Sequence, residues 1–354
     1  MRSNTWQAFA ILCQTGTVPR ARPPRRPTIV DVAAAAGVAP STVSRAFSRP
    51  GRVNPHTREH VLLVAEKLGY EPNPAAQALE SGRTKTIALL VPDITNPYFS
   101  GVIKGAERAS AAAGLTLVLG DTQENPAHEE QLLRRLARAV DGFVISAPRL
   151  PDEGLQRAAE LSAITLVNRA TPGIACVVAD FDTGTEQIVD HLASLGHESF
   201  VFAGGPAESW SGARRWLGLR RAARKHGMSA QRFGPYTPTL AGGPAAADAV
   251  LASGATAVVC HNDMLAIGLL GRLAERRVDV PDDLSVAGFD NIFGADICNP
   301  PLTTLSEQTQ ESGARAVEAL VQQIRQPVSD PPTRVLATQL IVRPSTGEAR
   351  TRRR

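Results

Sequence analysis

"TIVDVAAAAGVAPSTVSRAFSRPG", residues 28–51, is the stretch that decides the fold of the first part of this chain. Thr28 is followed three residues later by Asp31, which predicts a capping box at a helix start, with Asp where Glu or Gln is usual. Gly37 suits the left-handed residue that ends a helix, and proline in the first turn favours a second helix over about residues 40–47. Helix, turn and second helix is the pattern of a helix-turn-helix, whose second helix lies in the major groove of DNA.

A third helix follows, since Asn54 is a favourable N-cap, Pro55 suits the first helical position and Gly69 ends the apolar pattern. Its inward face is predicted to carry Val61, Leu62, Val64, Ala65 and Leu68. Three such helices form either a DNA-binding module or a packing module with a solvated polar face. The basic excess favours DNA binding, because residues 1–84 hold 11 Lys and Arg against 5 Asp and Glu.

The second helix carries short polar side chains and one arginine near its exposed face, namely Ser41, Thr42, Ser44 and Arg45. Arginine can form two hydrogen bonds to one guanine edge, while Ser and Thr hydroxyls reach bases or phosphates. We therefore expect these residues to contact double-stranded DNA.

Composition indicates a globular protein of two or three domains, with 354 residues of which 43% are hydrophobic and 20% charged. The apolar run near the start, "AFAILC", is too short to span a membrane, and residues 1–27 end in the basic stretch "RARPPRRP". We expect a cytoplasmic protein without a membrane segment, in which residues 1–27 form a disordered basic extension. A secretory signal and a misassigned start site are the alternatives for these residues.

From Thr86 onward, apolar strands alternate with amphipathic helices. The predicted strands are "TIALLV", "LTLVLG", "GFVISA", "ITLVN", "SFVFAG", "TAVVC" and "LSVAGFD", and the predicted helices cover residues 97–113, 126–139, 183–195, 216–226 and 263–275. Such units build parallel sheets with helices on both faces, which bind ligands beyond the carboxyl ends of their strands. The length fits two doubly wound α/β subdomains after the all-α N-terminal module.

The opening stretch with its continuation to "PDITNPYF", and then "GHESFVFAGGP", "HNDMLAIG", "DDLSVAGFDN" and "PPLTTL", closely resembles the LacI/GalR family of bacterial transcription regulators. The resemblance implies a repressor that acts on double-stranded operator DNA as a homodimer or a dimer of dimers. It implies a helix-turn-helix domain over residues 28–73, a hinge helix and linker over 74–85, and an effector-binding and dimerisation core, similar to periplasmic binding proteins, over 86–347. Residues 348–354 are then a basic tail.

The resemblance also implies the residues that contact DNA. Pro40, Ser41 and Arg45 would face base edges, Thr42, Ser44, Arg52, Asn54 and Thr57 would lie near the backbone or flanking bases, and Leu79 of the hinge would insert between central base pairs in the minor groove. This chain departs from the family at Ala39, where a capping Ser is usual, and at Pro40, which has no donor for base readout. Gln77 and Glu80 stand where basic residues are common, and a carboxylate near phosphates weakens binding.

In the core, the resemblance implies a cleft that binds a small polar effector, with a sugar as the first prediction. The candidate residues are Asn96, Tyr98, Phe99, Asn168, Arg169, Ser209, Ser211, Arg215, Asn262, Asp263 and Asp290. Stacking aromatics and side chains that clamp hydroxyls suit such a ligand, although family members also respond to sugar phosphates, nucleosides, nucleobases or a partner protein. Asp263 could instead cap a helix, and Tyr98 and Phe99 could be core residues. Arg215 and Asp290 are the strongest candidates, because charges in an apolar α/β cleft need partners.

An enzyme is not predicted, and neither is a cofactor or a metal. A nicotinamide-dependent dehydrogenase would need G-x-G-x-x-G after "TIALLV", where the sequence reads "PDITNPYF". No Walker lysine loop or Ser-His-Asp ordering is present, and Cys13, Cys176, Cys260 and Cys298 are scattered without a CxxC pair. A sugar-binding module of a transport system would need export and would lack the basic N-terminal module.

Overall fold

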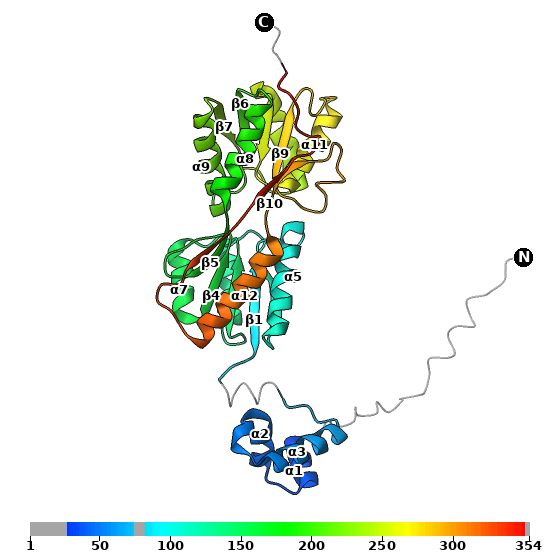
Figure 1. Ribbon diagram of the computed structural model, residues 1–354, viewed down its shortest axis with the longest axis vertical. Helices are drawn as coiled ribbons and strands as arrows, with labels where there is room; N and C mark the ends of the chain where they lie inside the picture. Colours follow the sequence, from blue (N-terminus) through cyan, green and yellow to red (C-terminus); the bar gives the residue numbers. More distant parts are fainter. Residues whose placement is uncertain (1–26, 74–81, 351–354) are drawn as a thin grey trace, which may run out of the picture. The chain divides into compact units, whose positions relative to one another are not determined.

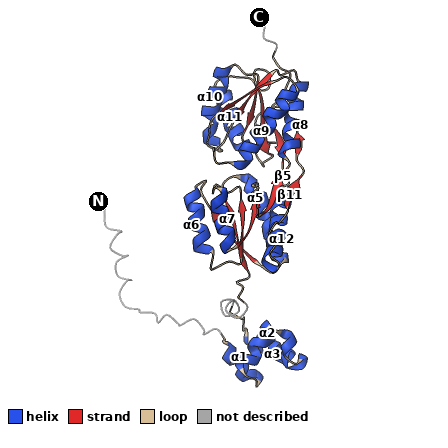
Figure 2. Ribbon diagram, turned by 90° about the vertical axis from the view of Figure 1, so that its left-hand side faces the viewer, coloured by secondary structure: helices blue, strands red, loops and turns tan. Residues whose placement is uncertain are grey.

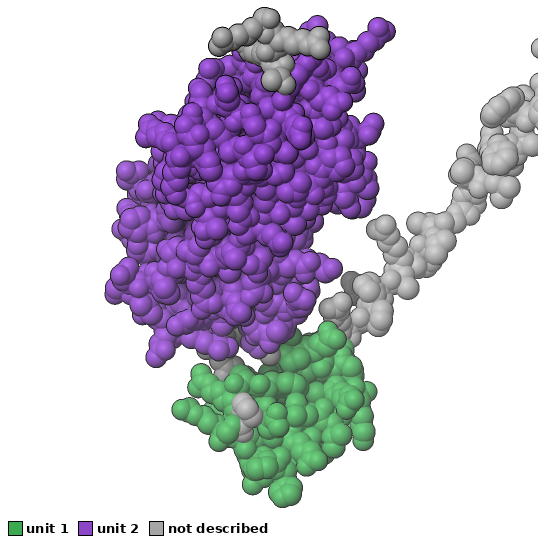
Figure 3. Space-filling view, turned by 45° about the horizontal axis from the view of Figure 1, so that its top comes forward, with its two compact units in different colours: residues 1–82 green, residues 83–354 purple. Residues whose placement is uncertain are grey.

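The computed structural model describes residues 27–73 and 82–350 and divides the chain into two compact units, residues 1–82 and 83–354 (Figure 3). Most of the predicted hinge, residues 74–81, lies outside the described residues, and so do residues 1–26 and 351–354.

The first unit consists of α1 (Ile29–Ala36), α2 (Pro40–Ser48), the 3-10 turn η1 (Pro50–Arg52) and α3 (Pro55–Leu68) (Figure 1). The predicted capping box at α1 is confirmed, since the backbone nitrogen of Thr28 donates to Asp31 Oδ2 at 2.7 Å. Gly37 ends α1 in the left-handed conformation, with φ of 66°. Ala39 gives no side-chain hydrogen bond to the start of α2. The helix-turn-helix therefore follows the local signals of its sequence.

The third helix is capped as predicted, because Asn54 Oδ1 accepts a hydrogen bond from the backbone of α3 at 3.0 Å and Gly69 is left-handed. The core shared by the three helices consists of Val32, Ala33, Ala36, Val43, Ala46, Val61 and Ala65. The prediction that Leu68 points inward is wrong, since 39% of it is exposed. Tyr70, which follows the Gly69 turn, packs against this core instead, with its ring centroid 5.8 Å from that of Phe47.

The second unit contains two six-stranded sheets, one in each of two subdomains (Figures 1 and 2). The first sheet is parallel, in the order β11-β5-β4-β3-β1-β2, and consists of β1 (Thr86–Val91), β2 (Thr116–Asp121), β3 (Gly142–Ser146), β4 (Ala163–Val167), β5 (Ala175–Ala179) and β11 (Thr333–Leu336). The second, in the order β12-β10-β9-β8-β6-β7, consists of β6 (Ser199–Ala203), β7 (Ser229–Phe233), β8 (Ala257–Cys260), β9 (Ser285–Asp290), β10 (Thr303–Ser306) and the antiparallel edge strand β12 (Gln339–Ile341). The predicted pair of doubly wound α/β subdomains is confirmed.

In the first subdomain, helices cover both faces of the sheet, as Figure 2 shows. These helices are α5 (Pro97–Ala112), α6 (Pro126–Leu136), α7 (Asp152–Leu161) and α12 (Thr309–Arg325). Because side chains alternate along a strand, Ile87 and Leu89 of β1 pack with α5 and α12, while Ala88 and Leu90 pack on the opposite face with α6 and α7. Burial on both faces explains why β1 is continuously apolar.

The second subdomain repeats this arrangement with α8 (Phe181–Ser194), α9 (Trp210–Lys225), η2 (Leu240–Gly242), α10 (Gly243–Ser253) and α11 (Asp263–Glu275). Phe200 and Phe202 of β6 pack with α8 and α9, whereas Val201 and Ala203 pack with α10 and α11. α9 begins six residues before the predicted residue 216, because Ser209 Oγ caps it by accepting from a backbone nitrogen of its first turn at 3.1 Å.

Three short connections join the subdomains, namely Asp180 between β5 and α8, residues 307–308 between β10 and α12, and residues 337–338 between β11 and β12. They lie side by side, because Thr338 donates to the carbonyl oxygen of Asp180 and Gln308 donates to that of Ala337, each at 3.0 Å. The second connection returns the chain to the first subdomain, where α12 packs against α5.

Hydrogen bonds of the core extend slightly beyond the predicted bounds of 86–347. The backbone nitrogen of Thr84 donates to Asp141 Oδ1 at 2.6 Å, and that of Ala349 donates to the carbonyl oxygen of Leu195 at 2.8 Å. Within the described part of the chain, no helix is long and apolar enough to cross a membrane.

Close packing of α5 on α12 depends on glycine. A Cβ atom at Gly105 would lie 1.9 Å from the carbonyl oxygen of Gln310. We predict that Gly105→Ala lowers the free energy of unfolding of the core by about 1–3 kcal/mol, because the two helices must move apart. Gly271→Ala on α11 is the matched control, since nothing lies within 4 Å of its Cβ position, and it should stabilise the core by about 0.4–1 kcal/mol. Urea denaturation measures both changes, and equal effects would contradict the packing argument.

Candidate functional site

The outward surface of the helix-turn-helix carries the residues predicted to contact DNA. Pro40, Ser41, Arg45, Arg52 and Asn54 are exposed, while Thr42, Ser44 and Thr57 are half-buried. Leu79, Gln77 and Glu80 lie outside the described residues. Because the exposed side chains include a guanidinium and a hydroxyl on α2, this surface can offer hydrogen bonds to base edges and phosphates.

Packing of α2 against the other helices holds this surface in place. Val43 and Ala46 are fully buried on its inner face, and Arg58 of α3 donates from Nε to the carbonyl oxygen of Ala46 at 3.3 Å. Asn54 uses its side-chain oxygen as the cap of α3, which leaves the amide NH₂ group as its donor toward a phosphate.

In the core, a polar cleft lies between the two subdomains, at the carboxyl ends of β1, β3, β4, β6, β8 and β9. Its lining residues are Asn96, Tyr98, Phe99, Glu124, Ala147, Arg149, Asn168, Ser209, Ser211, Arg215, Pro238, His261, Asn262 and Asp290. Ligands of doubly wound sheets bind at this edge. The structure thus brings together nine of the eleven residues predicted for the effector, and leaves out Arg169 and Asp263.

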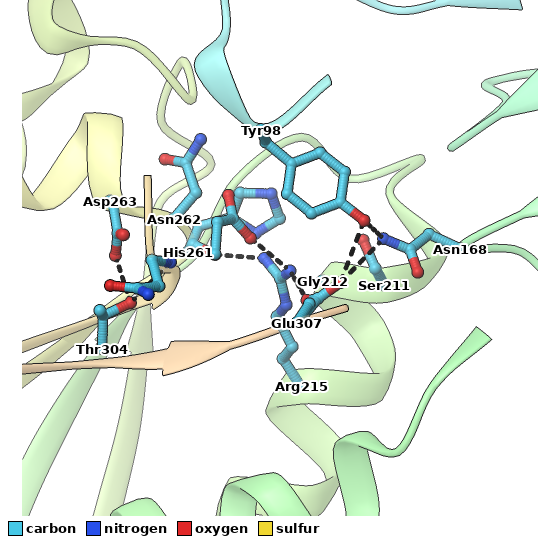
Figure 4. Close-up of polar contacts among 12 residues, drawn as sticks. Tyr98, Asn168, Ser211, Gly212, Arg215, His261, Asn262, Asp263, Thr304 and Glu307 are labelled. Atoms are coloured by element: carbon cyan, nitrogen blue, oxygen red, sulfur yellow. Dashed lines mark hydrogen bonds and ion pairs between the residues drawn. The ribbon is translucent and has the colours of Figure 1, made fainter. Parts of the chain in front are cut away.

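A buried ion cluster forms the floor of this cleft (Figure 4). Arg215 Nη2 donates to Asp290 Oδ1 at 2.9 Å and to Glu307 Oε1 at 2.8 Å, and Arg215 Nη1 donates to the carbonyl oxygen of His261. The rings of Phe181 and Phe289 lie 5.0 and 4.5 Å from the guanidinium carbon. All three charged side chains are at most 6% exposed, so they compensate one another away from water.

Glu307 also connects this cluster to the first subdomain. The Tyr98 hydroxyl donates to Glu307 Oε2 at 3.0 Å, and Asn168 Nδ2 donates to the same oxygen at 3.2 Å (Figure 4). Tyr98 belongs to α5 and Asn168 follows β4, whereas Arg215 belongs to α9 of the second subdomain. A single carboxylate therefore accepts hydrogen bonds from both sides of the cleft.

Burial shifts the protonation equilibria of the cluster. It raises the pKa of Asp290 well above its ordinary value, and the nearby Arg215 opposes this shift. Burial together with Glu307 and Asp290 raises the pKa of the Tyr98 hydroxyl. Burial lowers the pKa of Arg215, but the two carboxylates outweigh this effect and the net pKa is raised, so the guanidinium stays charged. Asp290 also has a φ of 106°, a conformation that side chains rarely adopt.

Sequence reasoning missed four polar residues of this region: Glu124, Arg149, His261 and Glu307. Arg149 donates from Nε to Glu124 Oε2 at 2.5 Å and forms the charged side of the cleft in the first subdomain. Burial, and then Arg215, lower the pKa of His261 well below its ordinary value, so this ring is neutral. Arg149, His261 and Glu307 each follow a strand end within three residues, which is the signal that could have found them.

The two predicted effector residues outside the cleft make structural contacts. Arg169 forms an ion pair with Asp152 at 2.7 Å. Asp263 Oδ1 accepts from the Thr304 hydroxyl at 2.6 Å, and its Oδ2 accepts from the backbone of residue 292 at 3.0 Å (Figure 4). Asn262 lines the cleft but also caps α11, since its Oδ1 accepts from a backbone nitrogen of that helix at 3.0 Å.

Within residues 27–73 and 82–350, no group of three or more His, Cys, Asp and Glu side chains is arranged to hold a metal ion. Cys176 and Cys260 are buried free thiols and Cys298 is half-buried.

Comparisons with known proteins agree with this architecture. Residues 28–73 match the model of bacterial regulatory proteins of the lacI family, and residues 189–346 match a periplasmic binding protein-like domain. The HTH-type transcriptional repressor CytR of Escherichia coli (strain K12) is 31% identical over 90% of this chain and 96% of its own length. The HTH-type transcriptional regulator DegA of Bacillus subtilis (strain 168) is also 31% identical, over 92% of this chain and 99% of its length.

Among solved structures, a complex of the transcriptional regulator CelR with cellobiose is 29% identical, with a TM-score of 0.67 over 90% of this chain and all of that one. A Lac repressor dimer bound to operator shares the fold, with a TM-score of 0.80 and 24% identity over 91% of this chain and all of that one.

The chain consists of a helix-turn-helix unit followed by two α/β subdomains with a polar cleft between the subdomains. This combination defines a DNA-binding regulator whose core has the architecture of a ligand-binding protein. The chain belongs to the lacI family of bacterial regulatory proteins and is a transcriptional regulator. The relatives named above are transcriptional regulators rather than enzymes.

The buried Asp263 generates a test of the core electrostatics. Burial raises its pKa to about 7 from 3.8, so the folded state binds this proton more tightly than the unfolded state. The stability that the protonated Asp263 carboxyl contributes to the folded state is present in full below about pH 4 and is lost as the pH rises to about 7. We predict that, between pH 4 and 8, wild type loses roughly 2–4 kcal/mol of unfolding free energy relative to Asp263→Asn, which cannot titrate.

Urea denaturation at several pH values measures this difference. Asp248→Asn is the control, because Arg272 lowers the pKa of that exposed carboxyl and its pH dependence therefore lies below pH 4. A difference between wild type and Asp263→Asn that stays constant from pH 4 to 8 would contradict the raised pKa.

Proposed function

We propose that this regulator represses transcription by binding a two-fold symmetric operator as a homodimer, and that a small polar effector in the core cleft sets its affinity for DNA. The observation that carries the effector part is the buried cluster of Arg215, Asp290 and Glu307, which faces the cleft and is bonded to both subdomains. The protein acts by binding rather than catalysis, on DNA in the bacterial cytoplasm.

For DNA recognition, Ser41 and Arg45 carry the base contacts, because Pro40 offers no donor. Arg52, Asn54 and Thr57 contact the backbone or flanking bases, together with Thr42 and Ser44. Leu79 inserts into the minor groove at the centre of the operator and bends it. Support comes from the exposure of the α2 side chains and from the fold shared with an operator-bound Lac repressor dimer.

Two strongly exposed apolar side chains support the homodimer. Ile292, two residues after the end of β9, packs into the cluster that contains Tyr98 and Phe99, whereas Phe293 and Ile297 are 79% and 68% exposed. Exposed apolar side chains that form a contiguous patch mark interaction surfaces. We propose that they contact a second copy of the chain.

For the effector, the lining of the cleft suits a polar ligand of sugar size. Ser211, Asn168 and Asp290 offer hydroxyl, amide and carboxylate groups, and Tyr98 and Phe99 offer ring surface. Cellobiose is bound in the CelR structure and ribose in another relative, a LacI family regulator from Enterococcus faecium with 27% identity.

Arg45→Ala tests the base contact. It should reduce the preference at one base pair per half-site by roughly 1–3 kcal/mol, because a two-bond contact to guanine is lost. Selection from random DNA followed by titration measures the preference of both proteins. Lys67→Ala, at the end of α3, is the control and should leave the selected motif unchanged. An asymmetric motif bound by monomers, or an unchanged motif in Arg45→Ala, would contradict the proposal.

The effector site is tested with Asp290→Asn, which replaces the carboxyl group and keeps the shape of the side chain. Arg215→Ala is less suitable, because it would leave two buried carboxylates unpaired. In a thermal-shift screen of sugars and nucleosides, a ligand at a hundred times its dissociation constant should stabilise wild type by about 2.7 kcal/mol. The variant should bind the ligand with a free energy that is about 1.5–3 kcal/mol less favourable. It should still bind the operator, but the ligand should no longer change its affinity for the operator. Unchanged calorimetric affinity in Asp290→Asn would contradict the assignment.

A further inference from the structure

The charged side chains around the cleft indicate which chemical class of effector it can bind. We propose that the effector is an uncharged, hydroxyl-bearing molecule and that Glu307 makes the cleft reject anionic ligands such as sugar phosphates and nucleotides. This inference rests on the proposed effector function and adds a specificity-determining residue to it.

Glu307 is buried at the second connection between the subdomains, and its side chain is 2% exposed. Both of its oxygens already accept hydrogen bonds, Oε1 from Arg215 and Oε2 from Tyr98 and Asn168. Its carboxylate therefore stays beside the guanidinium and neutralises it at the place where an anionic ligand would need a cation.

The other cation of the cleft is neutralised as well. Arg149 is paired with Glu124, and Arg215 is paired with Asp290 and Glu307, so two guanidinium groups face three carboxylates. Protonation of Asp290 would remove the negative excess without creating a positive one. Among the residues that line the cleft, both arginines thus have carboxylate partners.

An anion could bond to Arg215 Nη2 only by displacing one of these carboxylates, and at Arg215 Nε it would meet a guanidinium whose charge the two carboxylates already neutralise. The displaced carboxylate would then be buried without its cation, which costs several kcal/mol. His261 does not supply the missing charge, because burial lowers its pKa well below the ordinary value and keeps the ring neutral. The electrostatics of the cleft consequently disfavour phosphate and carboxylate groups.

Unused hydrogen-bonding atoms indicate what the cleft does accept. Asn168 Oδ1, His261 Nδ1 and Arg215 Nε are buried and have no hydrogen-bond partner. A hydroxyl group can donate to the amide oxygen of Asn168, accept from the N–H of Arg215 Nε, and either donate to or accept from His261 Nδ1. A phosphate dianion has no proton to donate to Asn168. The unpartnered atoms and the charge balance therefore favour the same class of ligand.

The experiment compares matched ligands on the full-length protein. Thermal shift and calorimetry are measured with ribose and ribose 5-phosphate, glucose and glucose 6-phosphate, cytidine and cytidine 5′-monophosphate, and with cellobiose and inorganic phosphate. We expect at least one uncharged compound to stabilise wild type, and its phosphorylated counterpart to bind about 100-fold more weakly or not at all.

Glu307→Gln then removes the charge and keeps the shape of the side chain. In this variant the ratio of the dissociation constant of the phosphorylated ligand to that of its uncharged counterpart should fall about tenfold or more, chiefly because the phosphorylated ligand gains affinity. Tyr98→Phe removes a hydrogen bond to Glu307 but keeps the charge, so it should still reject the anion. Glu311→Gln, on the exposed face of α12, is the matched control and should leave the ratio of the two dissociation constants unchanged.

A phosphorylated ligand that binds wild type as tightly as its uncharged counterpart would overturn the inference, and this result does not depend on how well the variants fold. Equal discrimination in wild type and a folded Glu307→Gln would also overturn the role of Glu307. Stabilisation by none of the compounds would instead contradict the proposed effector site.

Discussion

The ion pairs of Arg215 with Asp290 and Glu307 are the contact on which the cleft depends. A guanidinium buried away from water needs both neutralisation and acceptors for its N–H groups. The rings of Phe181 and Phe289 cover the guanidinium, so the two carboxylates neutralise it and, with a backbone carbonyl oxygen, supply acceptors for its Nη groups in place of water, while Nε has no acceptor. A change at either carboxylate therefore alters the charge balance of the whole cleft rather than one hydrogen bond.

The location of Glu307 gives this cluster a second consequence. It lies in one of three adjacent connections between the subdomains and accepts hydrogen bonds from both of them. A ligand shifts an equilibrium between two arrangements of the subdomains only by binding one of them more tightly. Contacts that span the cleft, such as those of Glu307, can supply that difference. The charged residues thus lie where they can couple ligand binding to the relation between the subdomains.

Most elements with a strong local pattern were predicted, although the apolar strand β5 ("ACVVA") was missed. The helix α11 spans Asp263–Glu275 as predicted, and β1 spans "TIALLV" as predicted. The strands β7 ("SAQRF") and β11 ("TRVL") were not predicted, because each has few apolar residues and becomes a strand by pairing with β6 or β5. Nor does any local signal show that α12, which follows a strand of the second sheet, packs on the first. That placement follows from the three connections.

The sequence by itself determined the helix-turn-helix, because its caps and apolar period act between residues three or four apart, as with Thr28 and Asp31. Only the tertiary structure decided the composition of the cleft. It placed Asp263 in a structural contact and brought Glu307 into the cluster, 92 residues from Arg215 and 209 residues from Tyr98. The order of the strands and the crossings between the two sheets bring these residues together, and no pattern within a short stretch of chain encodes that order.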